Sequence, residues 1–371
     1  MEHSKNLIFL WENFGPMHFD RCECVNEILN QKVIGIELSS NSNTYDWNQG
    51  NQNSFEKVTL FENKDYKAFT LLYKLIKFRI KYGKSDWFLC HYELTGIFLF
   101  AIFLRVLGDN VFTMGDSKFD DYPRFIWKEL IKKIFMLPYK GALGCGRRSK
   151  DYLRFLGIPE NKIMLEYDTL SVKRIQKLAN SVPAPHGITY ENRHFTIVAR
   201  LVPKKNLHMA IQAYAEYKKS SSSSSYRPLH ICGSGPLEAE LKDLAKSLNV
   251  DQDIIFHGFI QSEHIAKLLA TTLSLILPSI EEQFGLVVIE AQAMGLPVLI
   301  SEVCGARDHL IRNTVNGFVF EPDNPEGLAW FMNLISSDQK LWQKMCEAAI
   351  ETSKKGDVSM FADGVKKLIE H

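Results

Sequence analysis

Long apolar runs are missing from this chain of 371 residues. The longest apolar stretch, Gly96 to Leu104, has nine residues, about half of what a helix needs to cross a bilayer. The segment from Met1 to Gly15 has neither a long apolar core nor a cleavage site, so we expect no signal peptide. The sequence therefore predicts a cytoplasmic protein whose apolar segments lie in a folded core.

A large charge of either sign is also missing, because the formal net charge is +1. A general affinity for nucleic acid is therefore not indicated. The two halves nevertheless differ: residues 1–185 carry a formal charge of +5 and residues 186–371 carry −4. This asymmetry makes the N-terminal half the candidate for contact with an anionic partner.

Cysteine is sparse, with seven residues at scattered positions. None of them has the spacing of metal ligands, and Cys22 and Cys24 are too close to pair with each other. Most lie in apolar segments, as reduced core cysteines do. We expect free thiols and no cysteine-bound metal.

Apolar strands alternate with helical segments along both halves, which predicts two doubly wound parallel α/β domains. Asn180 to Asn192 is rich in proline, glycine and polar residues and is typical of a linker. We therefore predict an N-terminal domain of residues 1–180 and a C-terminal domain of residues 181–355.

The most informative stretch begins with the apolar strand Leu273 to Pro278. An acidic loop follows it, and a helix is predicted to open at Gly285 and to stop at Gly295. A strand, a loop and a helix N-terminus in this order favour an anionic ligand, because free backbone N–H groups and the helix dipole attract negative charge.

Two carboxylates, Glu282 in the loop and Glu290 inside the predicted helix, frame this site. Carboxylates repel phosphates, so we expect both to accept hydrogen bonds from hydroxyl groups on either side of the anion. A ligand with a diphosphate centre and hydroxyl-rich ends is a nucleotide sugar. The alternative is an ordinary amphipathic helix whose glutamates face water.

Residues Ser279 to Val298 read S-x-x-E-x-F-G-x-x-x-x-E-A-x-A-x-G-x-P-V. This pattern resembles the signature of retaining glycosyltransferases of family four (glycosyl transferases group 1), which have the GT-B fold of two Rossmann-like domains. The resemblance implies that Glu282 binds the donor sugar and Glu290 the ribose, and that the amides of Phe284, Gly285, Leu286 and Val287 contact the diphosphate. It also implies that the C-terminal helix, about 356–371, packs back on the N-terminal domain.

Further motifs of the C-terminal half resemble the same family. Arg200 and Lys205 match its R-x-x-x-x-K segment and could stabilise the leaving diphosphate, although the family's preceding glycine is Ala199 here.

Gly233 and Gly235 match a glycine turn that the family places beneath the nucleotide. The position of Glu238 breaks the dinucleotide fingerprint G-x-G-x-x-G. His257 and Gly258 match a segment whose backbone holds the base.

The N-terminal half resembles the family only in outline. Gly15 falls where the family places a glycine loop near donor and acceptor, and an ordinary turn is the equal alternative. His91 and Asp116 end two predicted strands and could face an acceptor. The family frequently has a His-Asp pair where this chain has Gly115-Asp116, so we include Asp116 and no histidine among the catalytic candidates.

Two segments, Phe69 to Tyr82 and the helix predicted to start near Asp120, combine lysines with aromatic residues. They predict either peripheral contact with an anionic membrane at its inner face or a solvated basic surface.

The resemblance implies a retaining transfer of a sugar from a nucleoside-diphosphate sugar, for which we expect a UDP- or GDP-sugar, to an acceptor. The basic N-terminal half favours a glycan or lipid-linked acceptor, as in bacterial surface polysaccharide synthesis. No Asp-x-Asp follows a predicted strand, and cationic side chains already cover the phosphates, so we expect no metal and no other cofactor. Alternatives are an inactive GT-B-like binding protein, a nucleotide-dependent oxidoreductase and a sugar phosphorylase.

Overall fold

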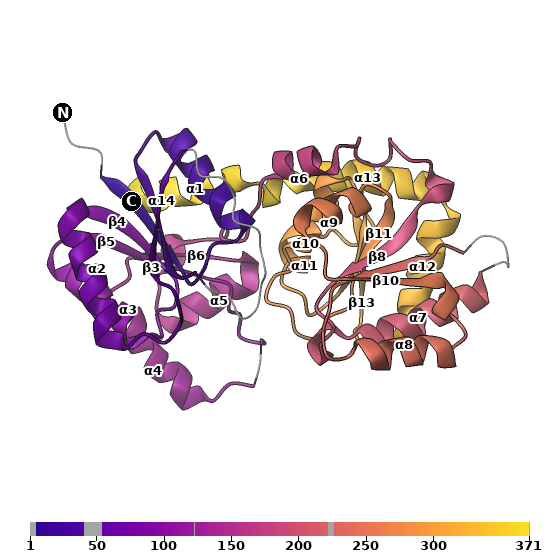
Figure 1. The fold of residues 1–371 in the computed structure, drawn as a ribbon, viewed down its shortest axis with the longest axis horizontal. Helices are drawn as coiled ribbons and strands as arrows, with labels where there is room; N and C mark the ends of the chain where they lie inside the picture. Colours follow the sequence, from indigo (N-terminus) through magenta and orange to yellow (C-terminus); the bar gives the residue numbers. More distant parts are fainter. Residues whose placement is uncertain (1–4, 41–53, 122, 222–225, 371) are drawn as a thin grey trace. The chain divides into compact units, whose positions relative to one another are not determined.

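The computed structural model describes residues 5–40, 54–121, 123–221 and 226–370. The chain forms two compact units. The first contains residues 1–171 and 358–371, and the second contains residues 172–357. Each unit is a parallel sheet with interleaved helices, so the predicted α/β fold class is confirmed (Figure 1).

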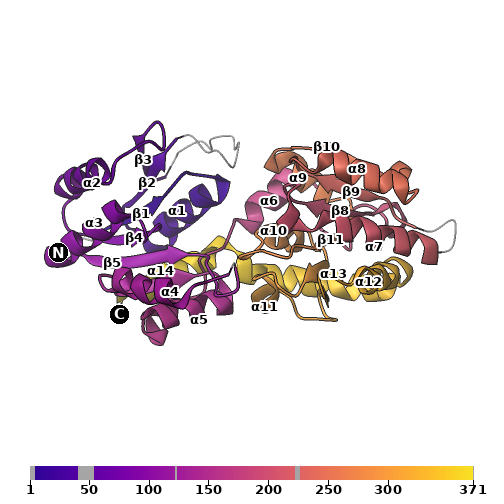
Figure 2. The ribbon, with the colours of Figure 1, turned by 90° about the horizontal axis from the view of Figure 1, so that it is seen from below.

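The first unit has seven parallel strands in the order β3-β2-β1-β4-β5-β6-β7. Its central strands are buried at every position except Asn6, which is partly buried, as expected for a parallel sheet covered on both faces. The helices α2 and α3 pack side by side on it (Figures 1 and 2). The elements are β1 (Asn6–Trp11), α1 (Pro16–Leu29), β2 (Val33–Ser39), β3 (Glu56–Phe61), α2 (Ala68–Tyr82), β4 (Ser85–Leu89), α3 (Thr95–Val106), β5 (Asn110–Gly115), α4 (Ile126–Met136), β6 (Gly141–Gly144), α5 (Gly146–Leu156) and β7 (Ile163–Met164).

The second unit has six parallel strands in the order β10-β9-β8-β11-β12-β13. The helix α7 packs beside α12 (Figure 2). The elements are α6 (Val172–Ala179), β8 (His194–Val198), α7 (Leu207–Ser220), β9 (Leu229–Cys232), α8 (Glu238–Ser247), β10 (Ile254–Gly258), α9 (Ser262–Leu269), β11 (Thr272–Leu277), α10 (Val287–Ala293), β12 (Val298–Ser301), α11 (Arg307–Leu310), β13 (Gly317–Phe320), α12 (Pro325–Ser337) and α13 (Gln339–Ser353).

The first boundary between the units falls at residues 171 and 172, not at 180 and 181 as the composition suggested. The reason is α6, which packs against α9 and α10. The side-chain amide of Gln176 also donates a hydrogen bond to the carbonyl of Ala293 (3.0 Å). The polar stretch after α6 is therefore internal to the second unit.

The last helix, α14 (Val358–Glu370), belongs to the first unit. It packs against α1 and β6, and the ring of Phe361 lies 5.6 Å from that of Phe9. Two hydrogen bonds lie where the chain leaves and re-enters this unit. Val358 N donates to Leu170 O (3.2 Å), and Val172 N donates to the carboxylate of Asp357 (3.1 Å).

Candidate functional site

Two loops of the second unit meet where its strand order changes direction. The chain continues from β8 to β9 on one side of the sheet and from β11 to β12 on the other. The loops that follow β8 and β11 therefore lie next to each other at the carboxyl ends of adjacent strands. Such a switch point is where open α/β sheets bind ligands. It holds the candidates Arg200 and Lys205 on one loop and Glu282 on the other.

Backbone and side-chain hydrogen bonds join these two loops. Asn206 adopts a left-handed conformation (φ 55°) and donates from its side chain to the carbonyls of Pro278 (3.2 Å) and Pro322 (2.7 Å). Ile280 N donates to Lys204 O (3.0 Å). Because both loops are held at several points, the side chains they carry are positioned before any ligand binds.

Lys205 and Glu282 form an ion pair at the centre of this junction. Ser279 Oγ donates a second hydrogen bond to Glu282 Oε2 (3.1 Å). The two paired side chains are only 14% and 16% exposed. A neighbouring pair, Lys204 and Glu281 (2.9 Å), is 40% exposed at both residues. The inner pair thus presents one cation and one carboxylate together, one suited to a phosphate and the other to a hydroxyl group.

The glycine turn after β9 packs directly on the loop that carries Arg200. A Cβ on Gly233 would lie 1.9 Å from Ala199 O, and one on Gly235 would lie 2.4 Å from Leu201 O. Leu201 N donates to Ser234 O (3.0 Å), and Gly233 N donates to Gly258 O (2.8 Å). Glycine is needed for this close approach. The side chain of Arg200 is exposed, but its backbone is held in place by the contacts of Ala199 and Leu201 with the glycine turn.

The helix after β11 begins later than the sequence suggested. Gly285 has φ 108°, which is not helical, and α10 starts at Val287. Glu290 consequently lies in the first turn of α10 and not deeper in the helix, and it is partly buried.

Phe284 is buried, and its carbonyl accepts a hydrogen bond from Ala306 N (3.0 Å). The Phe284–Val287 segment is thereby tied to the loop after β12.

His257 belongs to a row of three histidines across β8, β9 and β10. Its Nε2 lies 3.1 Å from Nδ1 of His230, whose ring stacks on His194 with centroids 3.7 Å apart. Burial lowers the pKa of His194 to about 3 and that of His230 to about 4, and it also lowers the pKa of His257. The row is therefore neutral at pH 7, and the exposed His257 side chain contacts His230.

The candidates of the first unit occupy the corresponding strand ends. Gly15 caps α1 with an extended backbone (φ −99°), a conformation open to any residue, and its N–H donates to His18 Nδ1 (2.9 Å). Asp116 follows β5. Burial and the nearby charge of Asp168 raise the pKa of Asp116 to about 6.

His91, after β4, has φ 59° and lies 3.4 Å from Glu93. Burial lowers the pKa of His91, but the hydrogen bond that His91 donates to Glu93 and the charges of Glu93 and Asp116 raise it above its usual value. His91 and Asp116, whose pKa values are both raised, thus lie at the strand ends of this sheet.

The second unit matches a known family over almost its whole length. The model of the family "Glycosyl transferases group 1" covers residues 181–356. Over these residues the chain is similar to the glycosyl transferases group 1 family. The resemblance to this family that was inferred from Ser279 to Val298 is thereby confirmed.

Two relatives of this chain are named as glycosyltransferases. The chain is 32% identical over 152 residues to an uncharacterised glycosyltransferase of Methanocaldococcus jannaschii, covering 41% of this chain and 38% of the relative. It is 29% identical over 228 residues to the amylovoran biosynthesis glycosyltransferase AmsK of Erwinia amylovora, covering 59% of this chain and 50% of the relative. Each alignment spans half or less of the relative's own length.

Solved glycosyltransferases share the fold. Anabaena Alr3699/HepE, solved in complex with UDP and glucose, matches with a TM-score of 0.74 at 15% identity, over 99% of each chain. At this identity the likeness concerns the fold alone. The predicted GT-B fold is confirmed by this likeness, which extends over nearly the whole chain.

Sequence reasoning missed several buried polar residues near the first unit's strand ends. Glu37 on β2 accepts hydrogen bonds from Phe14 N (2.8 Å) and Thr59 Oγ1 (2.7 Å) and pairs with Lys57 (2.9 Å). It thereby fixes the loop that leads to Gly15. Its only signal in the sequence is a single acidic residue within the apolar run of β2.

Arg21 is likewise buried, and its guanidinium pairs with Asp168 (3.2 Å) and donates to Thr169 O (3.1 Å).

Within the described ranges, no group of three or more His, Cys, Asp or Glu side chains is arranged to hold a metal ion. In the same ranges, no helix is both long and apolar enough to cross a bilayer.

Proposed function

We propose that the protein is a retaining glycosyltransferase that moves a sugar from a nucleoside-diphosphate sugar, a UDP- or GDP-sugar, to a glycan or lipid-linked acceptor. The observation that carries this proposal is the contact of Lys205 with Glu282 at the switch point of a group 1 domain. The name of AmsK, a relative in amylovoran biosynthesis, supports a role in bacterial polysaccharide synthesis.

In this proposal Arg200 and Lys205 bind the diphosphate. The negative charge on the diphosphate grows as the glycosidic bond to the donor sugar breaks, so cations fixed beside it stabilise the transition state more than the bound donor. Lys205 then exchanges part of its contact with Glu282 for a phosphate oxygen. The amides of Phe284 to Val287 add hydrogen bonds to the same group.

The two glutamates orient the ligand in the same proposal. Glu282, held by Ser279, accepts hydrogen bonds from donor-sugar hydroxyls, and Glu290 accepts them from the ribose. Gly233, Gly235 and the backbone at Gly258 line the nucleotide. The proposed reaction needs no metal, since the two cationic side chains neutralise the phosphates.

On the acceptor side, Asp116 is the proposed contact to the incoming hydroxyl. Its pKa of about 6 suits a carboxylate that takes up a proton near neutral pH. We further propose peripheral contact with an anionic membrane, which would bring a lipid-linked acceptor within reach.

The test is the release of nucleoside diphosphate from a panel of nucleotide sugars, in buffer with a chelator. One donor should be hydrolysed slowly, and E282A and R200A should each lower kcat/KM on the order of 100-fold. The matched control for Glu282 is E281A, because Glu281 sits in the same loop in the more exposed pair with Lys204. It should change kcat/KM less than about fivefold.

An absence of release from every donor, together with no thermal stabilisation by free UDP or GDP, would favour the inactive binding protein and refute the site. Equal losses in E281A and E282A would refute the assigned role of Glu282. Dependence on an added divalent cation would refute the metal-independent reaction.

A further inference from the structure

The outward side of α4 is unusually apolar for a helix on a protein surface. Six large side chains on and directly after it are between 46% and 79% exposed, namely Ile126, Trp127, Leu130, Ile131, Ile134 and Leu137. Surface helices ordinarily bury such residues and expose their polar ones. Contiguous exposed apolar side chains of this kind mark an interaction surface.

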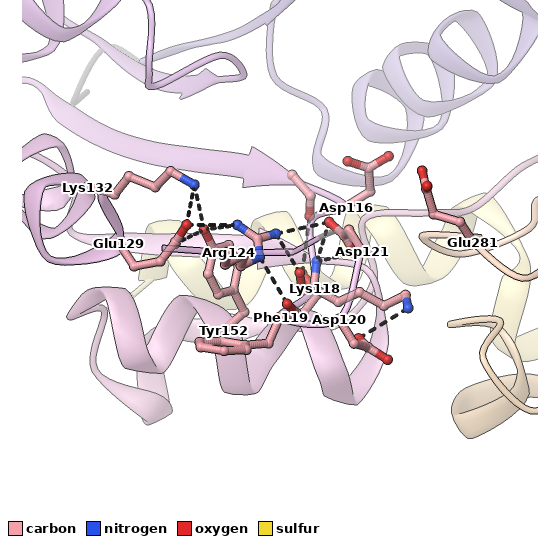
Figure 3. A network of polar contacts seen from close by, with 12 residues as sticks. Asp116, Lys118, Phe119, Asp120, Asp121, Arg124, Glu129, Lys132, Tyr152 and Glu281 are labelled. Atoms are coloured by element: carbon pink, nitrogen blue, oxygen red, sulfur yellow. Dashed lines mark hydrogen bonds and ion pairs between the residues drawn. The ribbon is translucent and has the colours of Figure 1, made fainter. Parts of the chain in front are cut away.

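The inward side of the same helix carries a buried polar network beside the buried Met136. Glu129 is 2% exposed and accepts hydrogen bonds from Arg124 (3.3 Å), Lys132 (2.8 Å) and Tyr152 (2.6 Å), as Figure 3 shows. The guanidinium of Arg124 also lies over the ring of Tyr152, 4.2 Å from its centroid. The helix is therefore attached to the first unit through a satisfied polar network, and its apolar side is left facing outward.

Cations accompany the exposed apolar residues, and acids do not. Lys128 and Lys133 are exposed, and Glu129, the single acidic residue of α4, is buried in the network beneath the helix. Lys128 lies 5.4 Å from the ring centroid of Trp127. The outward side thus combines aliphatic side chains, one tryptophan and positive charge, which is the composition of helices that lie in a lipid interface.

The rings of Phe98 on α3 and Phe135 on α4 are 4.7 Å apart, so the two helices are in contact. At the C-terminal end of α3, Val106 and Leu107 are 79% and 47% exposed, and the neighbouring Arg105 is exposed as well.

We propose that α4 is a membrane-docking helix that lies flat in the headgroup region of an anionic bilayer and inserts Trp127, Ile131 and Ile134. Its 11 residues span about 16 Å, too short to cross the hydrocarbon core of about 30 Å. A second copy of the chain docked through its own α4 is a poorer occupant, because it would bring two equally basic surfaces together without acidic residues of α4 to pair with them. This proposal rests on the lipid-linked acceptor of the proposed function and names the surface that reaches it.

The experiment is co-sedimentation of the full chain with vesicles, either phosphatidylcholine alone or an equal mixture of phosphatidylcholine and phosphatidylglycerol, at low and high salt. The protein should bind the mixed vesicles at low salt and be released at high salt. The double variant W127S/I131S should weaken binding at least tenfold, and K128Q and K133Q roughly fivefold each.

The matched control is W330S, because Trp330 on α12 is 60% exposed, close to the 59% of Trp127, and lies in the other unit. W330S should bind like the unchanged protein, and thermal unfolding in buffer should show that all variants fold. Equal losses in W330S and W127S/I131S, equal binding to both vesicle types, or no binding at low salt would overturn the proposal. So would a dimer in sedimentation equilibrium that W127S/I131S converts to monomer without any vesicle binding.

Donor hydrolysis by the unchanged protein, measured without vesicles, tests the transferase independently. Hydrolysis without vesicle binding would refute the docking helix alone. Vesicle binding without hydrolysis would refute the transferase and leave the docking surface standing.

Discussion

Replacing Gly233 by alanine should destabilise the second unit by an amount that the structure allows us to estimate. Gly233 has φ 139°, a conformation that costs other residues about 1–2 kcal/mol. The new Cβ would also lie 1.9 Å from Ala199 O and 2.8 Å from Ala199 C. Both atoms belong to the backbone, so the strand ends must move apart at a further cost of about 1–3 kcal/mol. We expect G233A to lower the free energy of unfolding by about 2–5 kcal/mol.

The matched control is G258A, in the same unit. Gly258 also has positive φ (67°), but a Cβ there meets no atom within 4 Å. Urea unfolding of the full chain should therefore show only about 1–2 kcal/mol of destabilisation for G258A. Because the displaced loop carries Arg200, G233A should also weaken the binding of free UDP or GDP. Equal destabilisation by the two variants would show that the close approach of Gly233 to Ala199 is not what stabilises this junction.

Two further predictions concern the first unit. The pKa of Asp116 is raised from 3.8 to about 6 in the folded protein, so its contribution to stability is fully present below about pH 4 and is lost as the pH rises through 6. Urea unfolding between pH 4 and 8 should show the stability of the unchanged protein falling relative to D116N, whereas parallel curves would contradict the raised pKa. E37A should cost about 3 kcal/mol, because it leaves Lys57 and Phe14 N buried without their acceptor. E62A, at an exposed carboxylate, should change the thermal midpoint little, and equal effects of E37A and E62A would contradict the role of Glu37.

The sequence was sufficient to predict the fold class and the amphipathic helix α2, because both depend on local periodicity. Phe69 to Tyr82 was predicted, and the helix is Ala68–Tyr82. The start of α10 was predicted two residues too early, because the positive φ of Gly285 depends on its packing against Leu277. Residues 172–179, which form α6, fell within the predicted N-terminal domain because their contacts with α9 and α10 are not visible in the composition of the linker.

The candidate site was predicted only in part, because contacts between residues on different strands are not visible in the sequence. The family motif pointed to Lys205 and Glu282, but their contact across 77 positions depends on β8 and β11 being neighbours in the sheet. The contacts within the histidine row, and those of Glu37, could be predicted only if the strand order and register were known. The polar side of α4 was equally hidden, because the lysine pattern alone did not reveal that Lys132 turns inward to Glu129. The assigned roles of the site residues remain predictions.

The chain leaves the first unit at Ser171 and returns at Val358, so the second unit is an insertion of 186 residues. For α14 to reach its place against α1 in an unfolded chain, an entire loop of this length would have to close, at an entropic cost of about 4–5 kcal/mol. Val172 and Asp357 are hydrogen-bonded in the folded second unit, which therefore holds the two ends of the loop together. Once that unit has folded, the closure is already accomplished. The order of folding should consequently be the second unit first, with α14 completing the first unit as a late step.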